Sequence, residues 1–319
     1  MTQKIITVVG ATGAQGRGVV AAFIGNEKFK VRAITRRPLS EAAEKLREKG
    51  AEVVQADIND VQSLKAAFAG SHVIYGITDF FEPFAKGGPE HGMEIEVQQG
   101  INLATAAAAT STLESYIWST LPHGMGISNG KYLIPHFEGK NRIDAFIRSH
   151  EDLLAKTTFL WVTWYHNNFS FPMFTPYYIP TAGKYVQFAT HSPNTPITTI
   201  GDVSANVGPF VEAIVAQPGI TRNGAIVQAS IGETTADALL QTWAKVNDKE
   251  ALIARTDVDT YNAMWPLWAA EMGVMMRFWD EYKEKSWTAP GKTVLTRKEL
   301  AIDETRFVQL EEAFKGVEY

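Results

Sequence analysis

The sequence contains no cysteine in its 319 residues. Disulfide bonds, thiolate nucleophiles and zinc or iron–sulfur sites with cysteine ligands are therefore excluded. The chain also lacks a block of basic residues, and its formal net charge is −5. Because nucleic-acid binding relies on a concentrated positive surface, we expect no direct contact with nucleic acid, although a regulator could act through protein partners.

Long apolar segments are missing as well. No stretch approaches the roughly 20 consecutive apolar residues that a membrane-spanning helix needs. The N-terminus has the character of a strand rather than of a basic region followed by an apolar run, so we expect no signal peptide. We therefore expect no membrane span and a cytoplasmic protein, or a nuclear one if it is a regulator. A hydrophobic content of 45% suits one large globular domain or two modest ones.

Two further motifs of enzyme chemistry are absent. No Gly-x-Ser-x-Gly segment occurs, which disfavours a hydrolase. Four histidines, His123, His136, His150 and His166, do not show the spacing of metal ligands. We therefore expect no metal site.

A run of β-forming residues, Ile5–Val9, is followed at once by glycines at a spacing of three. This pattern predicts a buried strand, a tight turn and the start of a helix, where free N–H groups and the helix dipole suit a pyrophosphate. A tight turn without a ligand is the plain alternative. The residues of this turn that we expect to contact a dinucleotide are Gly10, Thr12, Gly13, Ala14, Gln15 and Gly16.

Strand and helix patterns alternate from this turn to residue 163. The predicted strands are 30–35, 52–55, 71–75, 115–118 and 158–163, and the predicted helices are 17–23, 41–48, 60–68, 94–110 and 137–149. Such alternation with short connections indicates an α/β fold, a Rossmann-type doubly wound parallel sheet. We expect 78–92 and 119–130 to be loops at the carboxyl edge of the sheet, where ligands bind in this fold.

Beyond Trp164 the composition changes, and we predict a smaller C-terminal α+β lobe. The predicted domains are 1–164, a nucleotide-binding domain to which later strands could return, and 165–319, a substrate or partner lobe. In the lobe we expect strands at 184–188 and 225–229, and helices at 204–216, 233–246 and 260–282. Methionine and tryptophan are frequent in the last helix, which favours core, with an apolar lid or partner groove as the alternative.

Two arginines, Arg36 and Arg37, follow the predicted strand 30–35, and no acidic residue occurs before Glu41. At this position an acidic residue selects NAD, whereas a guanidinium grips the 2′-phosphate of NADP. The pair therefore favours NADP(H), with a solvated basic turn as the alternative. Topology alone places two further pairs beside the cofactor, Asp57 and Ile58 near the adenine and Ile77 and Thr78 near the nicotinamide ribose. Asp57 could instead be a turn former.

The sequence resembles the NmrA-like family of atypical short-chain dehydrogenase/reductases. The segments that carry the resemblance are the G-x-x-G-x-x-G turn Gly10–Gly16, Arg36-Arg37, Pro135–Lys140 with the sequence PHFEGK, Tyr165–Phe169 and Gly201–Val203. The resemblance implies a Rossmann-type NADP-binding domain with a small C-terminal lobe. The family includes regulators that bind a dinucleotide without turning it over, and also quinone and isoflavone-type reductases.

One catalytic residue of that superfamily is absent. Its members use a Tyr-x-x-x-Lys pair with a Ser or Thr, and here Lys140 and Ser119 hold their places while His136 stands at the tyrosine position. None of the ten tyrosines has a lysine four residues later. One possibility is that His136, Tyr132 or Tyr165 supplies the proton. A second is that Lys140 itself acts in catalysis, as the resemblance to isoflavone-type reductases implies. A third is that the protein does not catalyse a reaction. His136 could also simply cap the helix that begins near Phe137.

We predict an NADPH-dependent oxidoreductase that acts on a hydrophobic quinone-like or carbonyl small molecule, as a monomer or homodimer. The alternative is a non-catalytic NADP(H) redox sensor or transcriptional co-regulator that acts through protein partners. The residues expected to line the substrate pocket are Phe80, Phe81, Tyr132, Trp164, Tyr165, Asn167 and Phe169.

Overall fold

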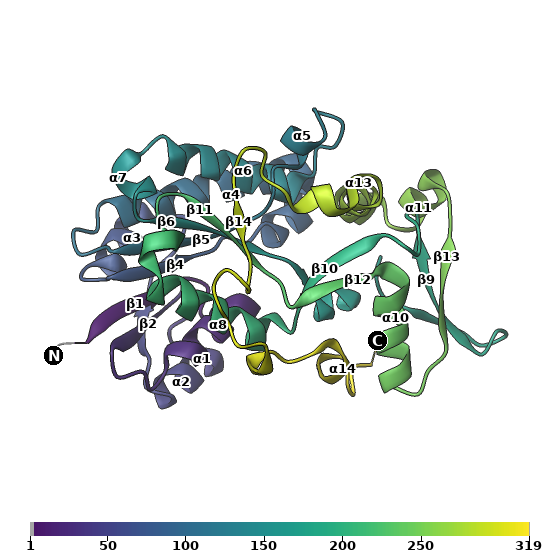
Figure 1. Cartoon of the computed structure of the whole chain (residues 1–319), viewed down its shortest axis with the longest axis horizontal. Coiled ribbons are helices and arrows are strands. Elements are labelled where there is room, and N and C mark those ends of the chain that lie inside the picture. Colours follow the sequence, from purple (N-terminus) through teal and green to yellow (C-terminus); the bar gives the residue numbers. More distant parts are fainter. Residues whose placement is uncertain (1–2, 319) are drawn as a thin grey trace.

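The computed structural model describes residues 3–318; residues 1, 2 and 319, at the outer ends of the two predicted domains, lie outside the described residues. Within that part of the chain, eight parallel strands form a central sheet (Figure 1). In spatial order these strands are β3 (Glu52–Gln55), β2 (Phe29–Thr35), β1 (Lys4–Val8), β4 (Val73–Gly76), β5 (Ser115–Thr120), β6 (Thr157–Val162), β11 (Ala225–Ala229) and β14 (Val294–Leu295). The strand order reverses between β1 and β4, which is where doubly wound sheets bind ligands.

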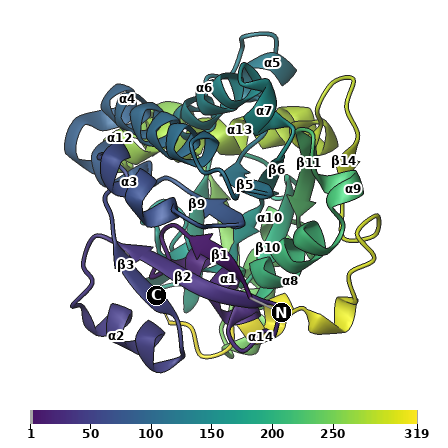
Figure 2. The same cartoon turned by 90° about the vertical axis from the view of Figure 1, so that its left-hand side faces the viewer.

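Helices cover both faces of this sheet (Figure 2). One face carries α3 (Val61–Phe68), α4 (Phe81–Ala108), α6 (Pro135–Arg148) and α7 (Glu151–Leu154), and the other carries α1 (Ala14–Phe23), α2 (Glu41–Glu48) and α8 (Val203–Ala216). Short helices α5 (Gly124–Ile127) and α9 (Pro218–Thr221) lie at the periphery. Two apolar layers result, and the central strands β4, β5 and β6 are buried along their whole length. The predicted Rossmann-type fold is confirmed.

Small residues bring α1 and α8 close together. A Cβ on Gly18 would lie 2.7 Å from the Ser204 carbonyl oxygen, and a Cβ on Gly208 would lie 2.9 Å from the Gly18 carbonyl oxygen. Only glycine at both positions permits this approach. The close contact fixes α1, and with it the turn that precedes α1.

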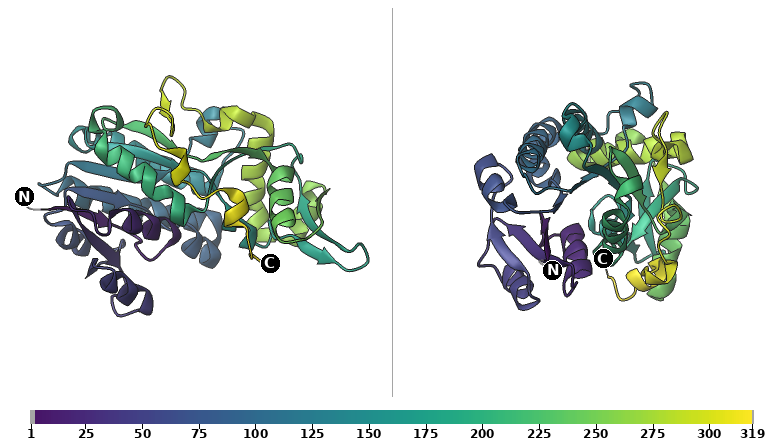
Figure 3. Two further views of the ribbon diagram at one scale, coloured as in Figure 1. Left: turned by 60° about the horizontal axis from the view of Figure 1, so that its bottom comes forward. Right: turned by 60° about the vertical axis from the view of Figure 1, so that its left-hand side comes forward.

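The second half of the chain adds two small sheets, which extend the molecule beyond the carboxyl edge of the central one (Figure 3). One contains β7 (Trp164–Tyr165), β10 (Pro196–Gly201) and β12 (Gly232–Thr235), and the other contains β8 (Tyr177–Ile179), β9 (Lys184–Ala189) and β13 (Ala251–Arg255). The helices of this region are η1 (His166–Ser170), α10 (Ala236–Val246), α11 (Val258–Met264), α12 (Pro266–Trp268), the π-helical turn η2 (Ala269–Gly273), α13 (Val274–Tyr282), η3 (Lys283–Trp287), η4 (Glu304–Arg306) and α14 (Leu310–Ala313).

The two halves interleave, because β11 and β14 return to the central sheet from beyond residue 164. β11 is the predicted strand 225–229, which we expected in the smaller lobe. A domain division at 164/165 stays a prediction, since the later part of the chain contributes to both regions.

The predicted loop 78–92 is wrong, because α4 begins at Phe81. The Asp79 carboxylate accepts hydrogen bonds from the backbone N–H groups of Phe81 and Glu82 and so starts the helix. Gly88, at φ +84°, breaks the helical geometry and Pro89 follows it. Glycine and proline, which suggested a loop, instead produce a kink within a helix.

Three predictions for the second half also need correction. Strands β10 and β13 were not expected, and the predicted helix 233–246 begins only at Ala236, after β12. The predicted helix 260–282 is divided, because Pro266 interrupts it after α11 and the π-helical turn η2 follows. Local composition did not reveal these strands, since their partners lie far away in sequence.

A buried carboxyl group ties α6 to the sheet. Asp144 Oδ1 accepts hydrogen bonds from Trp118 Nε1 and Thr120 Oγ1, both at 2.8 Å. Burial raises the pKa of Asp144 to about 7, although these two hydrogen bonds and the nearby Arg148 oppose the shift. The folded protein therefore retains a proton on this carboxyl at pH values where the unfolded chain has released it.

We expect Asp144→Asn to change how stability depends on pH. Between about pH 4 and pH 7 the unfolded chain releases a proton that folded Asp144 keeps, so the wild type loses on the order of a few kcal/mol as pH rises. The variant lacks this loss and gains stability relative to the wild type across the same range. Urea unfolding from pH 4.5 to 8 measures the difference; equal slopes for both proteins would refute the assignment. Asp152→Asn on the exposed side of α7 is the control.

Candidate functional site

A cavity of about 1000 Å³ opens at the carboxyl edge of the central sheet, where the strand order reverses. It extends from Arg36 and Arg37 at one end to Trp279 and Trp287 at the other. The glycine turn after β1 and the side chain of Lys140 lie between these ends. The cavity therefore connects a basic rim, a phosphate-type turn and an aromatic compartment.

The glycine turn has the backbone geometry that its sequence predicts. Gly10 has φ +62°, and the Gly13 N–H donates to the Gly10 carbonyl at 2.8 Å. A Cβ on Gly16 would lie only 2.1 Å from the Gly10 carbonyl oxygen. Helix α1 starts immediately after Gly13, and its first residues Ala14, Gln15 and Gly16 line the cavity. This arrangement suits an anionic group such as a pyrophosphate.

At the basic rim, Arg36 pairs with the helix α4. Arg36 Nη2 lies 2.8 Å from Glu82 Oε2, and Lys86 Nζ lies 3.0 Å from Glu82 Oε1. The hydrogen bond from Arg36 lowers the pKa of Glu82 to about 2. Arg37 is exposed and lines the same rim. Two cations thus pair with one carboxylate, and together with Arg37 on the same rim they can hold a phosphate dianion.

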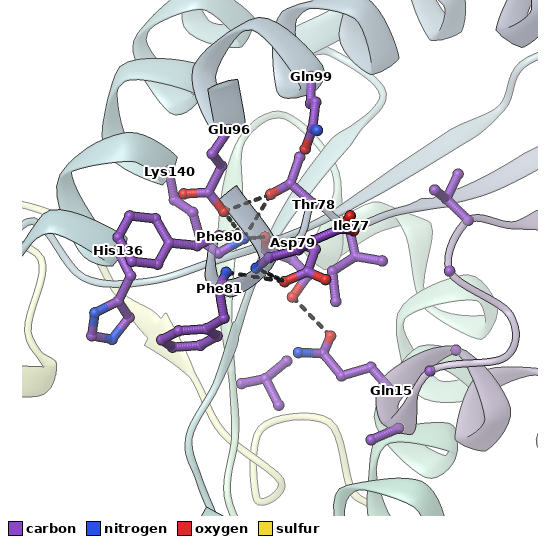
Figure 4. A pocket seen from close by; sticks show the side chains of 18 of the residues that line it. Gln15, Ile77, Thr78, Asp79, Phe80, Phe81, Glu96, Gln99, His136 and Lys140 are labelled. Atoms are coloured by element: carbon purple, nitrogen blue, oxygen red, sulfur yellow. Dashed lines mark hydrogen bonds and ion pairs between the residues drawn. The ribbon is translucent and has the colours of Figure 1, made fainter. Parts of the chain in front are cut away.

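Lys140, on α6, is held in the middle of the cavity by a buried polar cluster (Figure 4). Its Nζ lies 3.2 Å from Glu96 Oε1 and donates to Thr78 Oγ1 at 3.0 Å. Thr78 in turn donates to Glu96 Oε1 at 2.8 Å. The Glu96 side chain has no exposed surface, and the Lys140 side chain is 12% exposed. The ammonium group is therefore fixed in position, with one face toward the cavity.

Gly139 makes room for this cluster. A Cβ at this position would lie 2.6 Å from Glu96 Oε2. The glycine that precedes the lysine in the PHFEGK segment therefore has a steric reason, since a side chain there would displace the carboxylate that holds Lys140.

His136 lies one helical turn before Lys140 and also lines the cavity. Its Nδ1 contacts Glu271 Oε1, and the same oxygen accepts the His136 backbone N–H at 3.2 Å. Glu271 belongs to η2, and its side chain has no exposed surface. The structure does not support a capping role for His136, because the N-cap of α6 is Ile134 and His136 lies inside the first turn, where Glu271 accepts its backbone N–H.

Ser119, at the end of β5, is engaged with the glycine turn. Its Oγ donates to Gln15 Oε1 at 2.8 Å, and the same oxygen accepts from the Tyr75 hydroxyl. Gln15 Nε2 donates to the Tyr165 hydroxyl. Burial raises the pKa of Tyr165 to about 12 and also raises that of Tyr75. Both phenols therefore remain protonated at neutral pH.

The aromatic compartment is built from both halves of the chain. Phe81 contacts Phe171 and Trp268, with ring centroids 5.4 and 5.9 Å apart. The cavity-lining aromatic and methionine residues are Phe80, Phe81, Phe137, Trp164, Tyr165, Phe171, Met272, Met275, Trp279 and Trp287. Such a wall suits a flat apolar molecule. The Met- and Trp-rich segment 260–282 is thus both core and cavity wall.

The structure brings most of the predicted site residues together. Those that line the cavity are Gly10, Thr12, Gly13, Ala14, Gln15, Gly16, Arg36, Arg37, Ile58, Ile77, Thr78, Phe80, Phe81, Ser119, His136, Lys140, Trp164 and Tyr165. Their roles stay predictions.

Four predicted residues lie outside the cavity lining. The Asp57 carboxylate accepts hydrogen bonds from the backbone and side chain of Asn59, which makes it a turn former. The Tyr132 hydroxyl donates to Glu281 at 2.8 Å. Asn167 is exposed on η1, and Phe169 is buried against Phe314. Asn168 and Phe171 line the cavity instead, because the turn of η1 points them inward.

The two buried carboxylates, Glu96 and Glu271, were not predicted from the sequence. Each lies on the apolar face of its segment, since Leu103 follows Glu96 by seven residues and Met275 follows Glu271 by four. An acidic residue on an apolar helical face was therefore the available signal. Only the fold shows which basic groups face them.

Among residues 3–318, no three His, Asp or Glu side chains are grouped so that they could hold a metal ion. In the same range, every helix is too short or too polar to cross a bilayer.

Comparison with known proteins shows the family and supports the fold. The sequence profile of the NmrA-like family matches residues 2–319. An NmrA-like family domain-containing oxidoreductase of Aspergillus hancockii, hkm9, is 29% identical over 260 residues, which cover 78% of this chain and 74% of that protein.

Two solved structures share the fold. NmrA, a negative transcriptional regulator in complex with NADP, matches with a TM-score of 0.73 and 20% identity over 99% of this chain and 96% of NmrA. The NADPH-dependent quinone oxidoreductase QOR2 of Escherichia coli, complexed with NADPH, matches with a TM-score of 0.68 and 16% identity over 97% of this chain and 98% of that one.

Gly16→Ala is expected to destabilise the folded protein by about 1–3 kcal/mol, because the added methyl group forces the backbone of the turn to move. Thermal or urea unfolding measures the effect. Gly219→Ala is the control, since a Cβ there has no neighbour within 4 Å. Equal stability of the two variants would contradict the close approach at Gly16.

Proposed function

The chain belongs to the NmrA-like family, and from this premise we propose that it is an NADPH-dependent reductase of a flat, apolar quinone or carbonyl compound. The match of the family model to residues 2–319 confirms the family resemblance that the sequence predicts. The observation that carries the proposal is the single cavity in which a glycine turn and an aromatic compartment meet at the buried Lys140 ammonium group. Such a cavity can place a dinucleotide against a second, apolar molecule.

The residues present fit NADP(H). The Gly10–Gly16 turn and the N-terminus of α1 would hold the pyrophosphate. Arg36 and Arg37, with Lys86 beside them, would hold the 2′-phosphate. The solved complexes of NmrA with NADP and of QOR2 with NADPH support this choice of cofactor. The binding of the 2′-phosphate would replace Glu82 as the partner of Arg36.

The cofactor, when bound, supplies a hydride from its nicotinamide ring. Lys140 is held rigidly by Glu96 and Thr78, so its ammonium group can bind the nicotinamide ribose and stabilise negative charge that develops nearby. Phe81 and Phe171, which line the cavity and pack on each other, would form a wall against one face of the flat acceptor and exclude water from it. The name of the relative hkm9 as an oxidoreductase, and of QOR2 as a quinone oxidoreductase, supports this class of acceptor.

A second candidate is a non-catalytic sensor of NADP(H). The absence of the Tyr-x-x-x-Lys tyrosine favours it, and so does the likeness to NmrA, a negative transcriptional regulator. In that case the cavity would bind the dinucleotide and a protein partner would read its redox state. A panel of quinone and carbonyl acceptors separates the two functions. No NADPH oxidation with any acceptor, together with a large difference in affinity between NADP+ and NADPH, would support the sensor.

The variant Arg36→Ala with Arg37→Ala is expected to lower NADPH affinity about 10- to 100-fold, since charge-assisted hydrogen bonds to the 2′-phosphate are lost. NADH affinity should change little, because NADH lacks this phosphate. Isothermal titration calorimetry with both nucleotides measures the ratio of the NADPH affinity to the NADH affinity. Arg47→Ala is the control, because Arg47 pairs with Glu44 outside the cavity. An unchanged NADPH to NADH ratio would refute the assignment.

We expect the loss of Lys140 to lower kcat/KM for NADPH-dependent reduction at least about 100-fold. Lys140→Met alone leaves the Glu96 carboxylate buried without its cation, which costs about 3–5 kcal/mol of stability. Lys140→Met combined with Glu96→Gln removes both charges and should recover much of that stability without recovering turnover. Arg142→Ala, on the exposed side of α6, is the control. Full activity of the double variant would exclude Lys140 from the reaction.

A further inference from the structure

The cavity presents a second buried ion-pairing site, four residues before Lys140 on the same helix. His136 Nδ1 contacts Glu271 Oε1, and Glu271 comes from η2, at the other end of the chain. The Glu271 side chain has no exposed surface, and that of His136 is 10% exposed. A carboxylate in such a place is costly unless a cation or strong hydrogen-bond donors compensate it.

The contact fixes where the imidazole proton lies. A carboxylate oxygen and an unprotonated ring nitrogen are both acceptors, so a hydrogen must lie between them. Glu271 Oε1 also accepts the His136 backbone N–H at 3.2 Å, as expected of an ionised carboxylate at a helix N-terminus. We assign this hydrogen to Nδ1, which donates it to Glu271. Nε2 remains as the free ring nitrogen, with no hydrogen-bond partner among the described residues.

The ring itself belongs to the acceptor compartment. It lies 5.9 Å from Phe80 and 5.8 Å from Phe81 between ring centroids, and it lines the cavity (Figure 4). Two edges of the imidazole are therefore distinct, one bound to a buried carboxylate and one available to a bound acceptor. Orientation of a histidine by a carboxylate in this way is a recurring device of proton-transfer sites.

The two phenols that could replace the missing tyrosine are less suited to proton donation. Burial raises the pKa of Tyr165 to about 12, and its hydroxyl already accepts the Gln15 side chain. Tyr132 donates to Glu281 and lies outside the cavity lining. Among the described residues, no lysine donates a hydrogen bond to either hydroxyl, and the Lys131 ammonium group lies over the Tyr132 ring instead.

We infer that Glu271 is the positioning residue of a His136–Glu271 pair that supplies the proton in the reduction. This inference rests on the proposed function. A hydride and its electron pair pass from the reduced dinucleotide to the acceptor, and the proton on protonated His136 Nε2 passes to the acceptor oxygen. The dinucleotide is oxidised, the acceptor gains two hydrogen atoms, and neutral His136 regains its proton from solvent. Glu271 stabilises the protonated ring and fixes its direction.

The pair also narrows the acceptor class. Proton donation matters only where the reduction builds negative charge on an atom that then accepts a proton. A carbonyl or quinone oxygen that lies against Phe80 and Phe81 fulfils this condition. The charged groups placed beside His136 are Glu271 on η2 and, one turn further along α6, Lys140 with its partner Glu96 of α4.

The first test needs no turnover. In the protein without substrate, the hydrogen between Nδ1 and Glu271 should give a low-field proton resonance by NMR, coupled to imidazole nitrogen in ¹⁵N-histidine-labelled protein. The resonance should disappear in His136→Asn, which assigns it, and in Glu271→Gln, and it should persist in Glu281→Gln. Glu281 is an exposed residue of α13 that binds Lys131 and Tyr132. Absence of the resonance in the wild type, or its persistence in Glu271→Gln, would overturn the inference.

The second test uses NADPH oxidation with a quinone acceptor. Glu271→Gln should lower kcat about 10- to 100-fold with little change in KM or NADPH affinity, and Glu271→Asp should retain part of the activity. Adding Glu271→Gln to His136→Asn should cause no further loss, because Glu271 acts through His136. Losses that multiply in the double variant would overturn the inference. A wild type that shows the resonance but no turnover would instead refute the proposed function.

Discussion

The site depends on one constraint: the negative charges of two buried carboxylates must be compensated by nearby basic groups. Glu96 and Glu271 have no exposed side-chain surface, and each faces one basic side chain of α6. Removing either cation would leave a buried charge unpaired, at a cost of about 3–5 kcal/mol. The helix α6 is therefore held in register from both sides, by α4 of the nucleotide-binding region and by η2 of the later region. Lys140 and His136 are fixed in the cavity as a result.

This constraint explains local features that composition leaves unexplained. Gly139 is required because a side chain there would meet the Glu96 carboxylate. The π-helical turn η2 follows Pro266 and brings Glu271 toward the N-terminus of α6, where its oxygen accepts the His136 N–H. The kink of α4 at Gly88 separates two functions of that helix. Its first segment carries Phe81 and Glu82 to the cavity, and its second segment carries Glu96 to Lys140.

The central sheet, the glycine turn and the basic rim were predictable because their signals are local. Apolar strands, three glycines and two arginines each act through backbone geometry or charge within a few residues. Strands β10 and β13 were not, since they form by pairing with distant segments. Glu96 and Glu271 carry a local signal, an acid on an apolar face, but that signal does not identify a partner. Tyr132, Asn167 and Phe169 failed as cavity residues because a single turn of η1 or a contact with Glu281 decides where such side chains point.

In the proposed reductase, a histidine donor at position 136 in place of a tyrosine has a consequence for the whole fold. A phenol donor can be supported by the lysine four residues later on its own helix, so the nucleotide-binding region alone could complete such a site. A histidine that donates a proton as a cation needs an anion beside it to stabilise its positive charge. Lys140 is itself a cation and cannot play this part. The anion here comes from residue 271, which reaches α6 only when the later region packs over the carboxyl edge of the sheet. Strands β11 and β14, which return to that sheet on either side of Glu271 in sequence, anchor the segment that delivers it. The proposed proton donor consists of His136 from the first half and Glu271 from the second, so it requires the two halves to interleave.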